Sequence, residues 1–166
     1  MKINYVKGDA TNPVVENGIT ALIPHVCNIN GGWGAGFVLA LSKKWKKPEK
    51  EYRKWFESKK DFSLGNIGPV FVEKHIAIIN MLAQSGYKST ENQLPVRYYA
   101  LVLCMEAVAN FAANFVRFNS QKVEIHTCKF ASDLGGLEWN TVEQLIEDIW
   151  IANGIPVTIY LWEGEK

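Results

Sequence analysis

A glycine-rich segment between an apolar run and a helical pattern constrains this chain more than any other feature. The apolar run 19–23 leads into two asparagines, and four glycines follow within six residues, over 31–36. Glycine at this density lets backbone N–H groups approach a ligand closely, or lets φ be positive. A strand, a glycine loop and a helix start, in this order, gather amide donors at the positive end of a helix. The segment therefore predicts an anion site, most commonly for phosphate.

A tight turn without a ligand is the alternative interpretation of this segment. Residues 31–36 lack the third glycine of G-x-G-x-x-G, and no Lys-Ser/Thr pair follows Gly36. Neither the dinucleotide fingerprint nor the P-loop is therefore present. Asn28 and Asn30 favour a ligand site, because amides just before a phosphate loop can both donate to and accept from sugar hydroxyls.

Apolar strand patterns alternate with helical patterns along the whole chain. We expect strands over 3–7, 19–27, 70–72, 75–82, 123–128 and 155–162, and helices over 37–45, 49–58, 95–118 and 139–152. This alternation predicts an α/β fold, a three-layer α/β/α sandwich with a mixed, largely parallel sheet, as a single domain over 1–166. Such sheets bind ligands beyond the carboxyl ends of their strands. The loops 28–36 and 132–136 both follow strands, so we expect them to face each other across one cleft.

Charge and cysteine content exclude several classes of protein. The formal net charge of +1 gives no overall attraction to nucleic acid or to an anionic membrane. The three cysteines are odd in number and widely spaced, which indicates neither a disulfide framework nor a zinc site. The first residues do not resemble a signal peptide, and no apolar run approaches about 18 residues. We expect a cytoplasmic monomer with no metal or cofactor and with neither a nucleic-acid nor a membrane partner.

Three segments together resemble the macrodomain family of ADP-ribose-binding modules. They are the opening Val-Lys-Gly-Asp-Ala-Thr (6–11), the loop Pro-His-Val-Cys-Asn-Ile-Asn-Gly-Gly-Trp-Gly-Ala-Gly (24–36) and the ending Val-Thr-Ile-Tyr (157–160). Pro-Glu-Lys-Glu-Tyr (48–52) adds a resemblance to the ADP-ribose 1″-phosphate phosphatase (Appr-1″-p processing) branch. The resemblance implies a macrodomain phosphatase that hydrolyses ADP-ribose 1″-phosphate to ADP-ribose and phosphate. The alternatives are a non-catalytic binder of ADP-ribose or a related nucleotide, and a hydrolase that removes ADP-ribose from a modified macromolecule.

The resemblance also implies roles for individual residues. Asp9 would accept a hydrogen bond from the adenine amino group, Asn28 would contact the distal ribose, and 30–36 would hold the diphosphate. The expected ligand-binding residues are Asp9, Ala10, Asn28, Asn30, Gly32, Trp33, Gly34, Ala35, Gly36, Gln84, Ala131, Ser132, Asp133, Leu134, Gly135 and Gly136. From spacing alone, Asp9 more commonly caps its own turn. Trp33 either covers the ribose or lies on the surface, and Gln84 is either a rim residue or an ordinary loop residue.

The catalytic candidates are His25, Asn28 and Asp133. An imidazole titrates near neutral pH and could protonate a leaving oxygen. Strand alternation places His25 on the face opposite Asn28, so a bulge at the strand end would be needed to turn its ring inward; a core histidine is the alternative.

Asp133, like Ala131, stands where the family usually has glycine. A carboxylate beside a diphosphate costs Coulomb energy unless it is turned away, protonated or paired. Asp133 therefore faces solvent, handles water or a distal phosphate, or weakens ADP-ribose binding.

A second macrodomain branch, which hydrolyses ADP-ribosyl-glutamate, uses a lysine late in the central strand and an aspartate in the second loop. The matching positions here are Leu82 and Gly135. A mechanism through a lysine adduct is therefore not expected.

Overall fold

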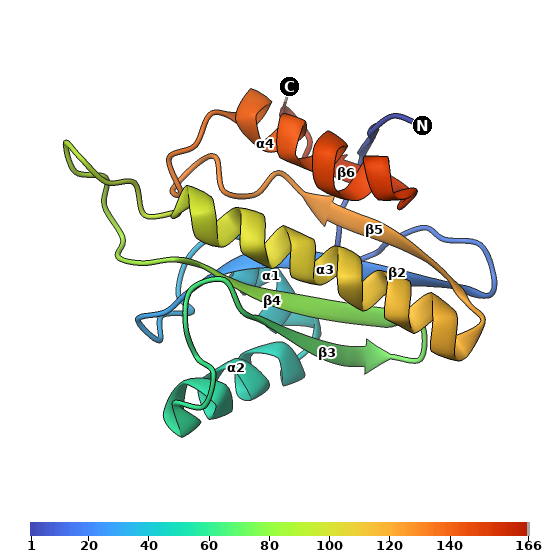
Figure 1. Cartoon of the computed structure of the whole chain (residues 1–166), viewed down its shortest axis with the longest axis horizontal. Helices are drawn as coiled ribbons and strands as arrows, with labels where there is room; N and C mark the ends of the chain where they lie inside the picture. Colours follow the sequence, from blue (N-terminus) through green and yellow to red (C-terminus); the bar gives the residue numbers. More distant parts are fainter. Residues whose placement is uncertain (166) are drawn as a thin grey trace.

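A six-stranded sheet forms the centre of the computed structural model, which describes residues 1–165 (Figure 1). The strands are β1 (Asn4–Lys7), β2 (Ile19–Asn28), β3 (Ile67–Glu73), β4 (Ile76–Gln84), β5 (Lys122–Cys128) and β6 (Val157–Leu161). Their order across the sheet is β1-β6-β5-β2-β4-β3. Every neighbouring pair is parallel except β3 with β4. The sheet is thus mixed and largely parallel, as predicted.

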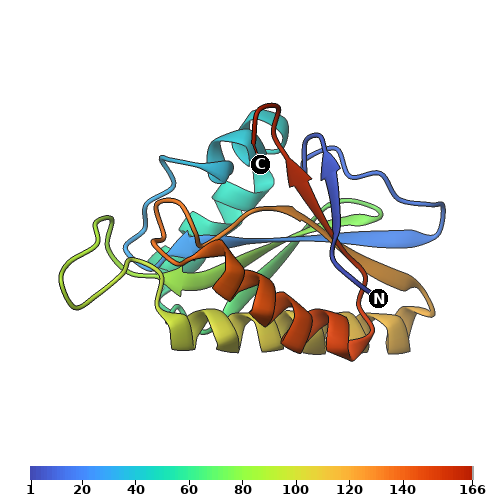
Figure 2. The same cartoon turned by 90° about the horizontal axis from the view of Figure 1, so that it is seen from above.

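Helices cover both faces of this sheet (Figure 2). On one face lie α1 (Phe37–Lys44) and α2 (Lys47–Ser58). On the other lie α3 (Tyr98–Asn119) and a continuous C-terminal helix. That helix consists of α4 (Trp139–Leu145), one π-helical segment, η1 (Ile146–Trp150), and one 3₁₀ turn, η2 (Ile151–Asn153). The predicted three-layer α/β/α sandwich is confirmed.

Several element boundaries differ from the expected ones, among them those of β3 (Ile67–Glu73, expected over 70–72) and β6 (Val157–Leu161, expected over 155–162), and two further differences have a local reason. α3 begins at Tyr98 and not at Pro95, because Val96 forms an isolated β-bridge with Gln84. His75 lies in the turn between β3 and β4 and not in a strand. Neither difference changes the layers.

The long helix α3 has an unusually apolar composition. An 18-residue window within it reaches a mean hydropathy of 1.5, so by length and composition α3 could span a membrane, contrary to the expectation from runs of apolar residues. The same composition serves a helix that packs on a sheet. Its buried residues, among them Leu101, Met105 and Val108, belong to the core shared with β2, β4, β5 and the C-terminal helix.

Pro24 explains why the sheet opens at one end. β2 pairs with β5 only from Ile19 to Leu22, although β5 continues to Cys128 beside β6. The Pro24 carbonyl points toward β5, where it accepts a hydrogen bond from Thr127 Oγ1 at 2.7 Å. A residue's N–H and C=O point to the same neighbour in a strand, and proline has no N–H, so the ladder with β5 cannot continue past this position. The ends of β2 and β5 therefore separate, and the space between them is where the site lies.

Candidate functional site

A cavity of about 370 Å³ lies at the carboxyl ends of β2, β4 and β5. Its lining residues are His25, Val26, Cys27, Asn28, Gly32, Trp33, Gly34, Ala35, Gly36, Phe37, Val38, Gln84, Tyr87, Cys128, Lys129, Phe130, Ala131, Asp133, Leu134 and Gly135. Both predicted loops contribute to one cavity, which confirms that they face each other. The volume lies in the range of small-molecule sites.

Five of the expected ligand-binding residues do not line this cavity: Asp9, Ala10, Asn30, Ser132 and Gly136. Ala10 is close to it, since it packs in a small buried cluster with Cys128 and Tyr160, against which Phe37 also packs. The turn of Asp9 and Ala10 therefore borders the end of the cavity that Cys128 lines.

The glycine loop presents unpaired backbone donors at the start of α1. Gly36 is the N-cap of α1, with φ 79° and ψ −147°, a conformation that suits glycine alone. Gly34, Ala35 and Gly36 are exposed, and within residues 1–165 the structure records no hydrogen bond for their N–H groups. Since the first amides of a helix point outward with partial positive charge, these groups can receive a phosphate.

Trp33 does not lie on the surface, which corrects one of its two expected placements, and its contact with the ribose stays a prediction. Its side chain is only 5% exposed. The indole Nε1 donates to Ser42 Oγ at 2.7 Å, and the ring lies 5.1 Å from Tyr52 and 5.4 Å from His25 between centroids. Trp33 thus packs beneath the glycine loop and is also one of the residues that line the cavity.

The side-chain amides of Asn28 and Asn30 make several hydrogen bonds within the protein. Asn28 Oδ1 accepts from the N–H of Asn30 at 2.9 Å, and its Nδ2 donates to the carbonyl of Gly86 at 2.8 Å. Asn30 Oδ1 accepts from the N–H of Gly86 at 2.8 Å. Among the described residues, one N–H of the Asn28 amide has no recorded partner, so Asn28 can still donate one bond to a ligand. Asn30 shapes the loop from outside the cavity.

His25 lines the cavity, but its ring is buried and bonded to a neighbouring strand. Its Nε2 lies 2.6 Å from Asn80 Oδ1, and the side chain is 2% exposed. The strand irregularity falls between Cys27 and Asn28, beyond His25, so the bulge that would reorient the ring is absent at the required position. Burial lowers the pKa of His25 to about 4, although the bond to Asn80 opposes this shift. A proton-donating role at neutral pH is therefore not supported.

Asp9 adopts the turn-capping role in this structure. Its Oδ1 accepts from the N–H and the hydroxyl of Thr11, both at 2.8 Å. The second oxygen, Oδ2, has no partner recorded among the described residues. The capping role and an adenine contact are thus compatible, because the two oxygens can serve them separately.

The second loop depends on tight backbone contacts. A Cβ on Gly135 would lie 2.5 Å from Val96 Cγ2 and 2.6 Å from the Ala131 carbonyl, so no side chain fits there. Ala131 adopts φ 65°, a left-handed conformation in which glycine is less strained. Asp133 is exposed and lines the cavity with its neighbour Leu134. Asp133 is thus both solvent-exposed and at the cavity, and its handling of water or of a distal phosphate and its effect on ADP-ribose binding stay predictions.

Sequence reasoning missed several lining residues, chiefly Tyr87, Lys129 and Phe130. Lys129 and Phe130 directly follow β5, so their place at a strand end was a usable signal. Tyr87 follows the end of β4 by three residues and carried no such signal. Late in β4, Leu82 is fully buried, whereas Gln84 reaches the cavity and donates to the Gly86 carbonyl at 3.1 Å.

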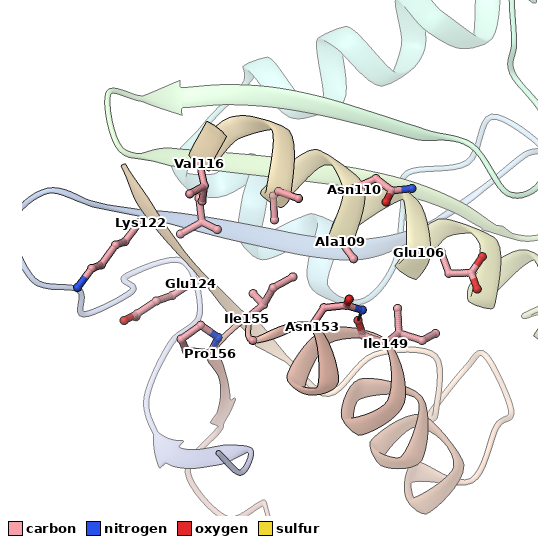
Figure 3. Close-up of a pocket in the computed structure, with 14 residues that line it drawn as sticks. Glu106, Ala109, Asn110, Val116, Lys122, Glu124, Ile149, Asn153, Ile155 and Pro156 are labelled. Atoms are coloured by element: carbon pink, nitrogen blue, oxygen red, sulfur yellow. Dashed lines mark hydrogen bonds between the residues drawn. The ribbon is translucent and has the colours of Figure 1, made fainter. Parts of the chain in front are cut away.

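A larger cavity of about 730 Å³ lies between α3, the start of β5 and the end of the C-terminal helix (Figure 3). Its labelled side chains include Glu106, Asn110, Lys122 and Glu124 around an apolar floor. It contains neither glycine loop, and none of the expected site residues lines it. Volume alone therefore does not identify the site, and the smaller cavity carries the convergent polar groups.

Comparison with known proteins gives relatives along nearly the whole chain. No protein-family model matches the sequence. A protein of unknown function from Bacteroides thetaiotaomicron is 42% identical, with a TM-score of 0.88, over 96% of this chain and 98% of that one. A macrodomain protein from Streptomyces coelicolor is 40% identical, with a TM-score of 0.80, over 96% of this chain and 99% of that one.

Two further comparisons concern ADP-ribose directly. The ADP-ribose 1″-phosphate phosphatase of Candida albicans is 22% identical over 151 residues, which cover 88% of this chain and 92% of the relative. The structure of Thermosipho africanus DarTG in complex with ADP-ribose has a TM-score of 0.65 at 14% identity, over 84% of this chain and 37% of that one. The second likeness concerns the fold alone.

Proposed function

The chain belongs to the macrodomain family, and on that premise we propose that it binds ADP-ribose and hydrolyses ADP-ribose 1″-phosphate to ADP-ribose and phosphate. One observation carries this proposal: the separated ends of β2 and β5 form a cavity whose rim holds the unpaired amides of Gly34, Ala35 and Gly36. Three amides at a helix start suit a diphosphate. The phosphatase relative supports the reaction, and the ADP-ribose complex of a protein with the same fold supports the ligand.

In the proposed reaction, a water oxygen bonds to phosphorus while the bond between phosphorus and the C1″ oxygen breaks, and the sugar oxygen takes a proton from solvent water. Asp133 is the carboxylate among the lining residues, so it would accept the proton of the attacking water. Asn28 would position the distal ribose through its remaining N–H, and loop amides would stabilise the charge on the phosphate oxygens. His25, neutral and bonded to Asn80, has no proton-transfer step.

Replacing Asp9 should weaken ADP-ribose binding without loss of the fold. Asp9→Asn keeps an amide oxygen for Thr11 but presents an NH₂ donor where the adenine amino group would need an acceptor. We expect the Kd for ADP-ribose, measured by calorimetry, to rise about ten-fold or more, as for the loss of one charge-assisted hydrogen bond. Asp148→Ala, on the exposed side of the C-terminal helix, is the matched control and should leave the Kd unchanged. Equal binding by Asp9→Asn and the native protein would exclude the adenine contact.

Phosphate release from ADP-ribose 1″-phosphate tests the reaction itself. We expect slow turnover without added metal, and a drop of at least about ten-fold in kcat for Asn28→Ala and for Asp133→Asn, because each removes a positioned group. Asp133→Asn should bind ADP-ribose at least as tightly as the native protein, since it removes a negative charge near the diphosphate. If the native protein binds ADP-ribose but releases no phosphate above background, it is a non-catalytic binding module.

A further inference from the structure

The segment 85–94, between β4 and α3, is tied to the cavity at Gly86. Asn28 Nδ2 and Gln84 Nε2 both donate to its carbonyl, at 2.8 and 3.1 Å, and its N–H donates to Asn30 Oδ1 at 2.8 Å. Two side chains at the ends of β2 and β4, and that of Asn30 in the loop after β2, thus hold one glycine, whose φ is 82°. The position of the next residue is fixed relative to the glycine loop.

That next residue, Tyr87, reaches across the glycine loop. Its hydroxyl lies so close to Gly32 that a Cβ there would be 2.1 Å from it, so Gly32 makes room for the tyrosine. The side chain is 61% exposed yet lines the cavity, and within residues 1–165 no hydrogen bond of its hydroxyl is recorded. Tyr87 is therefore an aromatic wall with a free donor at its tip.

The same segment also touches the second loop. A Cβ on Gly136 would lie 3.0 Å from Leu94 Cδ2 and 3.3 Å from Ser89 Oγ. The segment thus contacts the glycine loop near its start and the second loop near its end. It bounds the cavity on the side of Asn28, away from the side that Asp9 and Ala10 border.

We propose that Tyr87 determines substrate size at this site. With its ring against Gly32, it would close the end of the cavity beside the distal ribose. ADP-ribose that is free or carries a small group such as phosphate on C1″ fits, whereas ADP-ribose joined through C1″ to a macromolecule does not. The hydroxyl tip donates to the C1″ phosphate. This inference rests on the proposed function, because it assumes that the ribose lies at Asn28.

Binding competition tests the inference without requiring turnover. The probes are ADP-ribose, ADP-ribose 1″-phosphate and a short peptide carrying ADP-ribose through C1″. We expect the native protein to bind the peptide conjugate at least about 30-fold more weakly than ADP-ribose. Tyr87→Ala should reduce this ratio, the Kd of the conjugate divided by the Kd of ADP-ribose, about ten-fold. Tyr87→Phe keeps the ring and should keep this ratio. Because it lacks the hydroxyl, it should weaken the binding of ADP-ribose 1″-phosphate about five-fold relative to the binding of ADP-ribose.

Tyr99→Ala, a tyrosine 59% exposed on α3, is the matched control and should change neither ratio. A native protein that binds the conjugate as tightly as ADP-ribose, or a Tyr87→Ala variant with the native ratio, overturns the inference while the proposed function stands. If the native protein binds none of the three probes, the proposed function fails and the role of Tyr87 falls with it.

Discussion

Trp33→Ala should lower the free energy of unfolding by about 3–5 kcal/mol and abolish measurable ADP-ribose binding. Trp33 belongs to the buried cluster between the sheet and α1–α2, where it packs with Tyr52 and Leu41. Truncation removes the transfer free energy of the indole, leaves a cavity under the glycine loop, and deprives Ser42 of its donor. Denaturant unfolding and calorimetry measure the two effects. The amides of Gly34 to Gly36 should lose their fixed direction, because the support beneath them is gone.

Two controls separate packing from the single hydrogen bond. Trp33→Phe keeps much of the buried ring but deletes the Nε1 donor, so it should cost about 1–3 kcal/mol. Ser42 Oγ retains its own bond to Glu49 at 3.1 Å, which limits the loss. Trp162→Ala, at a tryptophan 47% exposed near the C-terminus, should change stability by no more than about 0.5 kcal/mol. A Trp33→Ala variant that unfolds at the native denaturant concentration would show that the loop does not depend on this side chain.

The sheet was predictable because its strands carry strong local signals. β2 and β4 are almost continuously apolar, as strands buried on both faces are. Helical spacing and the proline at the start of α2 marked the covering layers. The sequence also contains the cause of the early end of the β2–β5 pairing, because Pro24 has no N–H to donate to β5. Using this signal requires knowing that β5 is the neighbour of β2 on that side. That pairing is a tertiary fact which local pattern does not contain.

Side-chain directions at the site were less predictable than backbone positions. Glycine density shows that backbone must approach something closely, and the loops do meet at one cavity. It does not show where Trp33 points, since a large ring fits equally over a ligand or beneath the loop. Tyr87 carried no signal, because its contact with Gly32 joins segments that are separated by two strands and two helices. Whether the expected residues bind ADP-ribose stays a prediction.

Acid should destabilise the native protein through His25. The folded pKa of about 4 lies below the ordinary value of 6.5, so the unfolded chain binds more protons between these values. The free energy of unfolding should therefore be unaffected by this group above about pH 6.5 and fall as the pH drops toward 4. Linkage gives a loss of about 2 kcal/mol between pH 7 and pH 5 from His25 alone. Burial also lowers the pKa of His126, which adds to the loss in the same direction.

Comparing pH dependence, and not absolute stability, isolates this contribution. His25→Gln leaves an uncharged side chain that can bond to Asn80, so its unfolding free energy should fall about 2 kcal/mol less than that of the native protein between pH 7 and pH 5. His75→Gln, in the turn between β3 and β4, controls for the loss of a histidine elsewhere. Equal losses in the native protein and His25→Gln would mean that His25 titrates near its ordinary pKa. A phosphatase profile with a group near pH 6.5 that disappears in His25→Gln would restore His25 as a proton donor, because a ring held neutral by burial cannot produce it.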